Sequence, residues 1–427
     1  MIEVLVVVGP GVVADAGLLE EIAAREFAAA GVSGALVHAR DASHVLSLLS
    51  SPSSPEGAGG VVVLPGSSAE VRSLIGRDLG AVVWVDVERA DGVTAGEGAT
   101  HLHGRGVGGL AWGIRHAVHR VRHPSRRIAY GPLPEQRGEL YLPDADEPPV
   151  VMLIHGGYWR SIWAADIMGP LCADLVGRGF AVWNLEYRRP DLHGWDATTA
   201  DVAAGLAILA TAHAAPPYGS GTLPPYGSDT LPPDALQPDA DRTVALDLTR
   251  VTVVGHSAGA QLALRAVADA ATGGAQAAAD EAHADGGAGG AHAAGARAVG
   301  GVRVVMAVSL AGVLDLVEGD RRWVGTGAVG AALGGRAPEG QVAAPPYADA
   351  SPLLRLPLGV RQLVVQGAAD DLDLVDFSRR YARAAEEAGD EVTYLEMPGD
   401  HFDVINPATP IWQATARALA GDPAPRG

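Results

Sequence analysis

The sequence contains no lysine, so each of its 31 basic side chains is an arginine. Because 50 Asp and Glu residues stand against them, the formal net charge of the 427-residue chain is −19. Nucleic acids and anionic membranes both attract proteins through positive surfaces. The charge therefore argues against nucleic acid and against membrane as main partners.

Cysteine is nearly absent, and the single Cys172 can form neither an internal disulfide nor, by itself, a thiolate metal site. No apolar run approaches the 18 or so residues that a membrane span needs. Residues 1–8 are typical of a first strand rather than of a secretion signal. We therefore expect a soluble, cytoplasmic protein that uses neither a metal nor a cofactor.

Glycine and proline, in contrast, are abundant, and 56 Gly with 29 Pro make up roughly a fifth of the chain, against a usual share of about 12%. Much of this excess lies in an octapeptide at 216–223 that recurs almost unchanged at 224–231, and in an Ala, Gly, Asp and His segment at 270–298. Such segments bury too little apolar surface to offset the entropy of ordering. We expect surface insertions at 214–243 and 270–298.

Short apolar runs alternate with helical patterns through residues 1–122, which predicts a parallel sheet covered on both faces, in a small flavodoxin-like α/β domain. The expected strands are Ile2–Val8, Gly34–His38, Gly60–Leu64, Gly80–Val87 and Ala99–His103, and the expected helices are Ala16–Ala30, Ala42–Leu49, Ser68–Ile75 and Leu110–Arg122.

A second and larger α/β domain is expected at 150–420, after a linker and entry segment at 123–149 that leads into its first strand or two. The expected strands are Val150–Ile154, Ala181–Leu185, Val251–Val254, Val302–Val308, Gln362–Val365 and Glu391–Met397, with helices near Ile167–Arg178, Ala200–His213 and Asp376–Ala388.

The strongest chemical signal is GHSAG at 255–259, between an expected strand and a helical run. A sharp strand-to-helix turn of this kind lifts a serine hydroxyl out of the carboxyl edge of the sheet, so Ser257 is the predicted nucleophile. A serine needs a base, and in this fold class an acid and then a histidine follow it along the chain. His401 and Asp370 stand in that order after expected strands. Asp371, Asp373 and Asp376 share the loop with Asp370 and are alternative acids.

A fourth element is the turn His155-Gly156-Gly157, which ends the expected strand before it. Two glycines in a turn let backbone N–H groups approach a substrate oxygen. We therefore expect Gly156, Gly157 and Ala258 to form an oxyanion hole.

Five motifs carry a family resemblance: HGGYWR at 155–160, EYRR at 186–189, GW…DV at 194–202, GHSAGAQLA at 255–263 and GDHFDVINP at 399–407. Over roughly 130–420, without the insertions, the chain resembles the arylformamidase (kynurenine formamidase) branch of the α/β-hydrolases. The resemblance implies an α/β-hydrolase fold, a triad of Ser257, Asp370 and His401, and a role in tryptophan catabolism. The chain departs mildly from the pattern at Asp196 and Ala260.

Side chains within these motifs are candidates for substrate binding. An aryl pocket could be lined by Tyr158, Trp159, Tyr187 and Trp195, although single aromatic residues more often pack in a core. The arginines at 160, 188 and 189 could meet a substrate carboxylate or pair with Glu186.

The first domain weakly resembles type II dehydroquinase in its GPG, LPG and GRGVGG turns at 9–11, 64–66 and 104–109. Leu64 and Asp86 stand where that family has a catalytic Asn and His, so we expect a non-catalytic packing, assembly or binding module. Its histidines do not suggest a metal site, because no cysteine and few acids accompany them. They are His101, His103, His116, His119 and His123.

The leading hypothesis is a serine hydrolase that cleaves a small aryl formamide, such as N-formylkynurenine, through a formyl-enzyme. A carboxylesterase of broad specificity would use the same residues. A binding or assembly protein with a vestigial hydrolase site is the alternative from another class. The expected partner is a small-molecule substrate, with a homo-oligomer as a further possibility.

Overall fold

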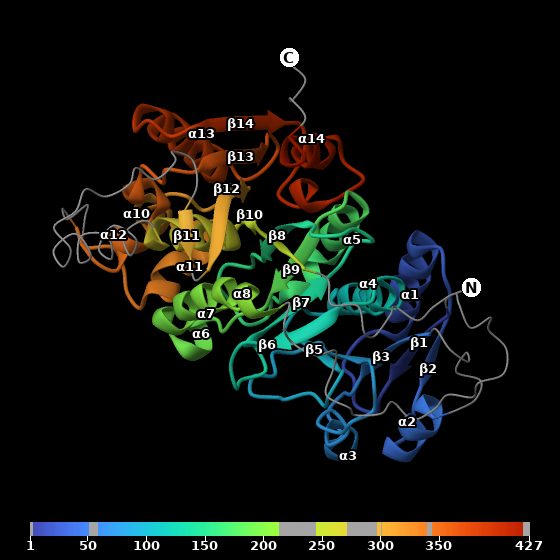
Figure 1. The fold of residues 1–427 in the computed structure, drawn as a ribbon. Coiled ribbons are helices and arrows are strands. Elements are labelled where there is room, and N and C mark those ends of the chain that lie inside the picture. The colour runs from blue at the N-terminus through green and yellow to red at the C-terminus, as the bar shows by residue number, and fades with distance from the viewer. Residues whose placement is uncertain are drawn as a thin grey trace. The chain divides into compact units, whose positions relative to one another are not determined.

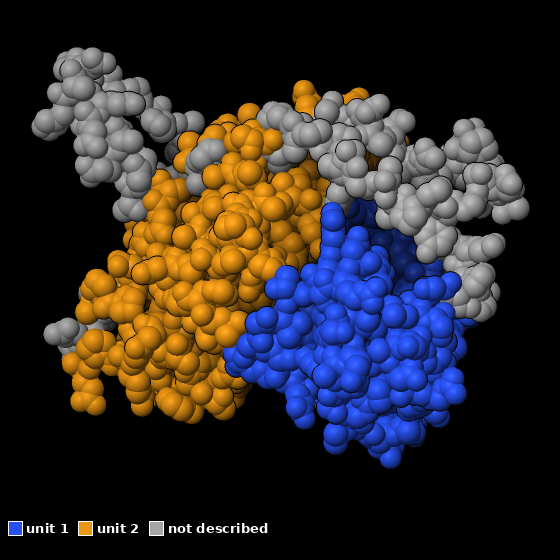
Figure 2. Space-filling model, turned by 90° about the horizontal axis from the view of Figure 1, so that it is seen from below, with its two compact units in different colours: residues 1–125, 217–242 blue, residues 126–216, 243–427 orange. Residues whose placement is uncertain are grey.

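The computed structural model describes residues 3–50, 59–212, 245–270, 297–299, 301–339 and 344–421. The described residues form two compact units, one up to Ser125 and one from Arg126 onward (Figure 1, Figure 2). The predicted insertion at 214–243 lies outside the described residues. So does the one at 270–298, apart from residue 270 and the strand β11 at Arg297–Val299.

Five parallel strands form the sheet of the first unit, in the order β2-β1-β3-β4-β5. Its valine-rich strands are buried on both faces, by α1 and α4 on one side and by α2 and α3 on the other. The order is that of flavodoxin-like folds, and the predicted small parallel α/β fold is confirmed. The elements are β1 (Glu3–Val8), α1 (Ala16–Ala30), β2 (Ser33–His38), α2 (Ala42–Leu49), β3 (Gly60–Leu64), α3 (Ala69–Arg72), β4 (Val82–Asp86), β5 (Thr100–His103) and α4 (Gly109–Arg122).

The sheet of the second unit has the order β14-β13-β12-β10-β8-β9-β7-β6, with β11 paired to β12. Neighbouring strands from β14 to β9 are parallel, whereas β7 and β6 add an antiparallel edge. The strands are β6 (Arg126–Ala129), β7 (Arg137–Tyr141), β8 (Pro149–Ile154), β9 (Ala181–Leu185), β10 (Asp247–His256), β12 (Val302–Leu310), β13 (Arg361–Gly367) and β14 (Val392–Met397). The entry segment at 123–149 thus supplies both antiparallel strands, β6 and β7.

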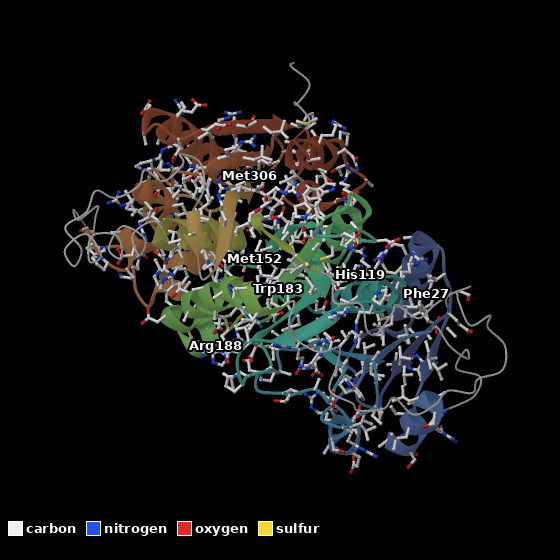
Figure 3. The ribbon with its side chains drawn as sticks, viewed as in Figure 1. Phe27, His119, Met152, Trp183, Arg188 and Met306 are labelled. Atoms are coloured by element: carbon white, nitrogen blue, oxygen red, sulfur yellow. The ribbon has the colours of Figure 1, made fainter. Side chains whose placement is uncertain are left out.

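Helices cover this sheet on both faces, and the core lies on its central strands. Met152 of β8, Trp183 of β9 and Met306 of β12 are buried there (Figure 3). The helices are η1 (Ala165–Met168), α5 (Gly169–Gly177), α6 (Pro190–His193), α7 (Trp195–Ala207), α8 (Leu209–Ala212), a helix over 258–270, α10 (Leu316–Arg321), α11 (Val324–Leu333), α12 (Tyr347–Ala350), η2 (Pro352–Arg355), α13 (Leu372–Glu387), η3 (Asp403–Ile405) and α14 (Pro410–Leu419).

The parallel strands all present their carboxyl ends at one edge of the sheet. The turns that follow β8, β10, β13 and β14 therefore meet at that edge, where open α/β sheets place their sites. Within the described part of the chain, no helix is long and apolar enough to cross a membrane.

Candidate active site

Ser257 occupies the turn between β10 and the helix over 258–270, with a left-handed φ of 55°. Two glycines make this turn possible. A Cβ on Gly255 would lie 2.1 Å from the carbonyl oxygen of Gly259, and a Cβ on Gly259 would lie 2.2 Å from that of Ile154. A non-glycine residue at positive φ costs on the order of 1–3 kcal/mol, and such strain often marks a functional site. The elbow (residues 255–259) therefore has the geometry predicted from its sequence.

The glycine turn after β8 lies directly against the serine. A Cβ on Gly156 would come within 2.8 Å of Ser257 Cβ, so only glycine allows this approach. The backbone N–H groups of Gly157 and Ala258 donate no hydrogen bond to other described residues. Both donors are thus available to a ligand oxygen beside the serine, and their role as an oxyanion hole stays a prediction.

Beneath this turn lies a buried polar network. His155 Nε2 lies 3.3 Å from Glu186 Oε1, and the Tyr187 hydroxyl donates to the His155 carbonyl oxygen at 2.8 Å. Glu186 Oε2 also accepts the Ala165 N–H at 3.0 Å, and Oε1 accepts from the buried guanidinium of Arg189. The network holds the glycine turn in place. The sequence offered one signal for it, an acid, Glu186, directly after an apolar strand.

Asp370 and His401 are in direct contact, with Asp370 Oδ2 2.9 Å from His401 Nδ1. The same oxygen accepts from Gln366 Nε2 at 2.9 Å, and Oδ1 accepts the Asp371 N–H at 2.7 Å. Burial opposes ionisation of Asp370, but the hydrogen bond with His401 and the two other donors outweigh it and lower its pKa. A carboxylate therefore faces His401 at neutral pH.

The other acids of this loop have different partners. Asp371 caps the N-terminus of α13, where its Oδ1 accepts the Asp373 N–H at 2.9 Å. Asp373 and Asp376 bind the Arg322 guanidinium at 2.9 Å and 2.8 Å. Of the alternatives that the sequence left open, the geometry therefore favours Asp370.

Ser257 makes no hydrogen bond with His401 among the described residues, so that link of the predicted triad is not formed here. The two are connected through His256, whose Nε2 lies 3.0 Å from the His401 carbonyl oxygen. Catalytic hydrogen bonds in unliganded sites are often long and tighten on substrate binding. The roles of Ser257, Asp370 and His401 stay predictions.

The candidate aromatic side chains differ in how much surface they offer. Trp159 is only 2% exposed, and its indole N–H donates to Gln261 at 3.1 Å. Trp195 is partly buried against the Trp159 ring, at 6.2 Å between ring centroids. Tyr158 is half-buried, with burial first and then the charges of Asp371 and Asp370 raising the pKa of its hydroxyl. Tyr158 and Trp195, unlike Trp159, are therefore only partly buried.

The arginines also divide clearly. Arg188 pairs with Asp201 at 2.7 Å, and Arg189 is buried with Glu186. Arg160 donates instead to the Gly325 carbonyl at 3.0 Å and to the Thr326 hydroxyl, and it forms no ion pair with any described carboxylate. Of the three, Arg160 is the one whose charge remains available to a ligand.

In the first unit, Asp86 binds Arg72 at 2.7 Å and His101 at 2.8 Å, and the His101 and His103 rings stack at 5.3 Å. Burial opposes ionisation of Asp86, but its bonds with His101 and Arg72 outweigh it and lower its pKa. In neither unit do the described residues group three side chains that could hold a metal ion.

Comparison with known proteins gives one family. A family model described as the alpha/beta hydrolase fold matches residues 151–405, the segment that contains Ser257, Asp370 and His401. Among curated proteins no sequence matches.

Solved structures give remote likenesses. A bacterial heroin esterase shares 21% identity over 69% of this chain and 82% of its own, with a TM-score of 0.46. An esterase of Thermogutta terrifontis shares 17% over 71% and 96%, with a TM-score of 0.45. Esterase B of Lactobacillus rhamnosis shares 16% over 69% and 85%, with a TM-score of 0.48. At these values the likenesses carry no conclusion about activity.

Proposed function

The chain belongs to the α/β hydrolase family, and from this we propose that it is a serine hydrolase acting on a small aryl formamide of the N-formylkynurenine type. The observation that carries the proposal is the hydrogen bond between Asp370 and His401, at the same sheet edge as the strained serine elbow. An acid that orients a histidine at the same sheet edge as a serine is the arrangement that activates a hydroxyl for acyl transfer.

In the proposed reaction, Ser257 Oγ attacks the formyl carbon while His401 Nε2 takes the hydroxyl proton. The N–H groups of Gly157 and Ala258 stabilise the negative charge that develops on the formyl oxygen. His401 then gives the proton to the leaving arylamine nitrogen as the C–N bond breaks. Water attacks the formyl-enzyme in the same way, and formate leaves with regeneration of the Ser257 hydroxyl. Asp370 holds the Nδ1–H of His401 throughout.

Two features support a small acyl group on an amino-acid-like leaving group. Ser257 is only 1% exposed and touches Gly156, which favours a formyl group over a long acyl chain. The negative charge of Asp371 and the positive charge of Arg160 both act on the Tyr158 hydroxyl. A leaving group that bears an ammonium and a carboxylate would thus find Asp371 for its positive charge and Arg160 for its negative charge, near the aromatic ring of Tyr158.

The test compares kcat/KM for N-formylkynurenine with that for p-nitrophenyl acetate and butyrate. We expect the formamide to be the better substrate. Arg160→Ala should raise KM for N-formylkynurenine about tenfold, because the substrate carboxylate would lose one charge-assisted hydrogen bond. The kcat/KM for the esters, which carry no such carboxylate, should stay within about twofold of wild type. Arg379→Ala, which removes an exposed arginine paired with Glu396, is the matched control and should change neither.

Ester turnover without deformylation would replace this function by that of a carboxylesterase. Turnover of neither substrate class would favour the non-enzymatic alternative, a binding or assembly module.

A further inference from the structure

The His401 loop (residues 398–404) and the serine elbow follow strands that are not neighbours in the sheet. The loop follows β14, which β13 and β12 separate from β10 and the elbow. Ala368 N–H donates to the carbonyl of Met397, the last residue of β14, at 2.8 Å, and Ala369 N–H donates to that of Gly399 at 2.9 Å. The start of the loop is thus joined to the segment that follows β13. These contacts position His401 against Asp370, but they do not position it against Ser257.

Among the hydrogen bonds of the described residues, one joins the elbow to the His401 loop, and His256 makes it. His256 Nε2 lies 3.0 Å from the His401 carbonyl oxygen, which can only accept, so Nε2 carries the proton. The two imidazole rings also pack at 4.8 Å between centroids, and the His256 ring lies 5.9 Å from that of Phe402. The residue directly before the nucleophile thus holds the residue that must act on it.

From this geometry we infer that His256 is a positioning residue, which through its Nε2–H bond to the His401 backbone sets the distance between the His401 imidazole and Ser257. The inference rests on the proposed function, because it matters only if Ser257 and His401 react together. His256 itself touches neither the substrate nor the transferred proton.

Two further observations describe the surroundings of the His256 ring. Its Nδ1 is buried with no hydrogen-bond partner among the described residues, and a Cβ on Gly156 would lie 3.1 Å from it. Native structures leave few buried polar atoms unpaired, and such atoms often mark functional constraint. Burial, followed by the proximity of His401, lowers the pKa of His256 to about 3, so its ring stays neutral beside the imidazolium that forms during the reaction.

The test compares His256→Phe, which keeps a flat ring but removes the donor, with His256→Gln, whose amide N–H reaches about as far as Nε2. We expect the phenylalanine variant to lose about 10- to 100-fold in kcat with KM within about twofold, the size of effect that a displacement near 1 Å produces. The glutamine variant should recover most of the loss. His116→Phe, a buried histidine of the first unit bonded to Thr100, is the matched control and should leave kcat unchanged.

The rate at which a fluorophosphonate labels Ser257 should follow the same order, since it needs the same alignment of serine and base. If the phenylalanine variant does not fold, His256→Ala provides the donor-free comparison without added bulk. Full kcat in a folded donor-free variant, or a glutamine variant as slow as the donor-free one, overturns the positioning role alone. A wild type that the reagent does not label overturns the proposed function with it.

Discussion

Replacing Ser257 with alanine is expected to lower kcat by about 10⁵-fold or more, for esters and formamides alike, because no other group can form the acyl-enzyme. The turn itself needs glycine at 255 and 259, and the substitution leaves both in place. An alanine at 257 would adopt the same positive φ as the serine and adds no new backbone strain. The variant should therefore fold as the wild type does. The measurement is steady-state turnover together with circular dichroism and thermal unfolding.

Ser309→Ala is the matched control for this variant. Ser309 is a fully buried serine on β12, the strand next to β10, and its hydroxyl has no hydrogen-bond partner within the described residues. Its loss should change neither kcat nor stability appreciably. Turnover that survives Ser257→Ala, or that disappears with Ser309→Ala in a folded protein, would contradict the assignment of the nucleophile.

Asp370→Asn is expected to lower kcat by about 10³- to 10⁴-fold with little change in fold, the size of effect that follows when the histidine is left in the wrong tautomer. The contacts explain why. Oδ1 accepts the backbone N–H of Asp371, whereas Oδ2 accepts from the side-chain amide of Gln366 and faces His401. Because a side-chain amide can turn and a backbone N–H cannot, an asparagine would place its NH₂ at the Oδ2 position beside His401. His401 Nδ1 would then accept rather than donate. Its proton would move to Nε2, which could no longer take the proton of Ser257.

Asp371→Asn separates this effect from a general change of charge in the loop. Asparagine caps helices as well as aspartate does, so the N-terminus of α13 should keep its cap. We expect kcat for p-nitrophenyl acetate within about threefold of wild type, against the loss of several orders at position 370. The reverse result would reassign the acid. Pre-steady-state acylation rates with this ester report the step directly.

Local features of the site could be predicted from sequence because they depend on neighbouring residues. The elbow needs small residues on both sides of Ser257, and the glycine turn after β8 needs residues without Cβ atoms. Both requirements are visible in a short motif. The strands are likewise visible as apolar runs, which is why the predicted parallel sheets agree closely with those observed.

Contacts between distant parts of the chain could not be predicted in this way. The bond from His256 to His401 joins residues 145 positions apart, and Gln366 reaches Asp370 only because β13 brings them to one edge. Trp159 was a candidate for ligand binding, yet its indole N–H is used by Gln261. Helix α11 escaped prediction because its Gly- and Ala-rich sequence has little contrast between its faces.

Covalent capture of the nucleophile tests the central claim most directly. Wild-type protein and the Ser257→Ala variant would be treated with a fluorophosphonate, digested, and examined by mass spectrometry for the modified peptide. We predict one stoichiometric adduct on the wild type, located at Ser257, and none on the variant. An adduct on another residue, equal labelling of the variant, or a wild type that remains unmodified would contradict the assignment of Ser257 as the nucleophile of a serine hydrolase.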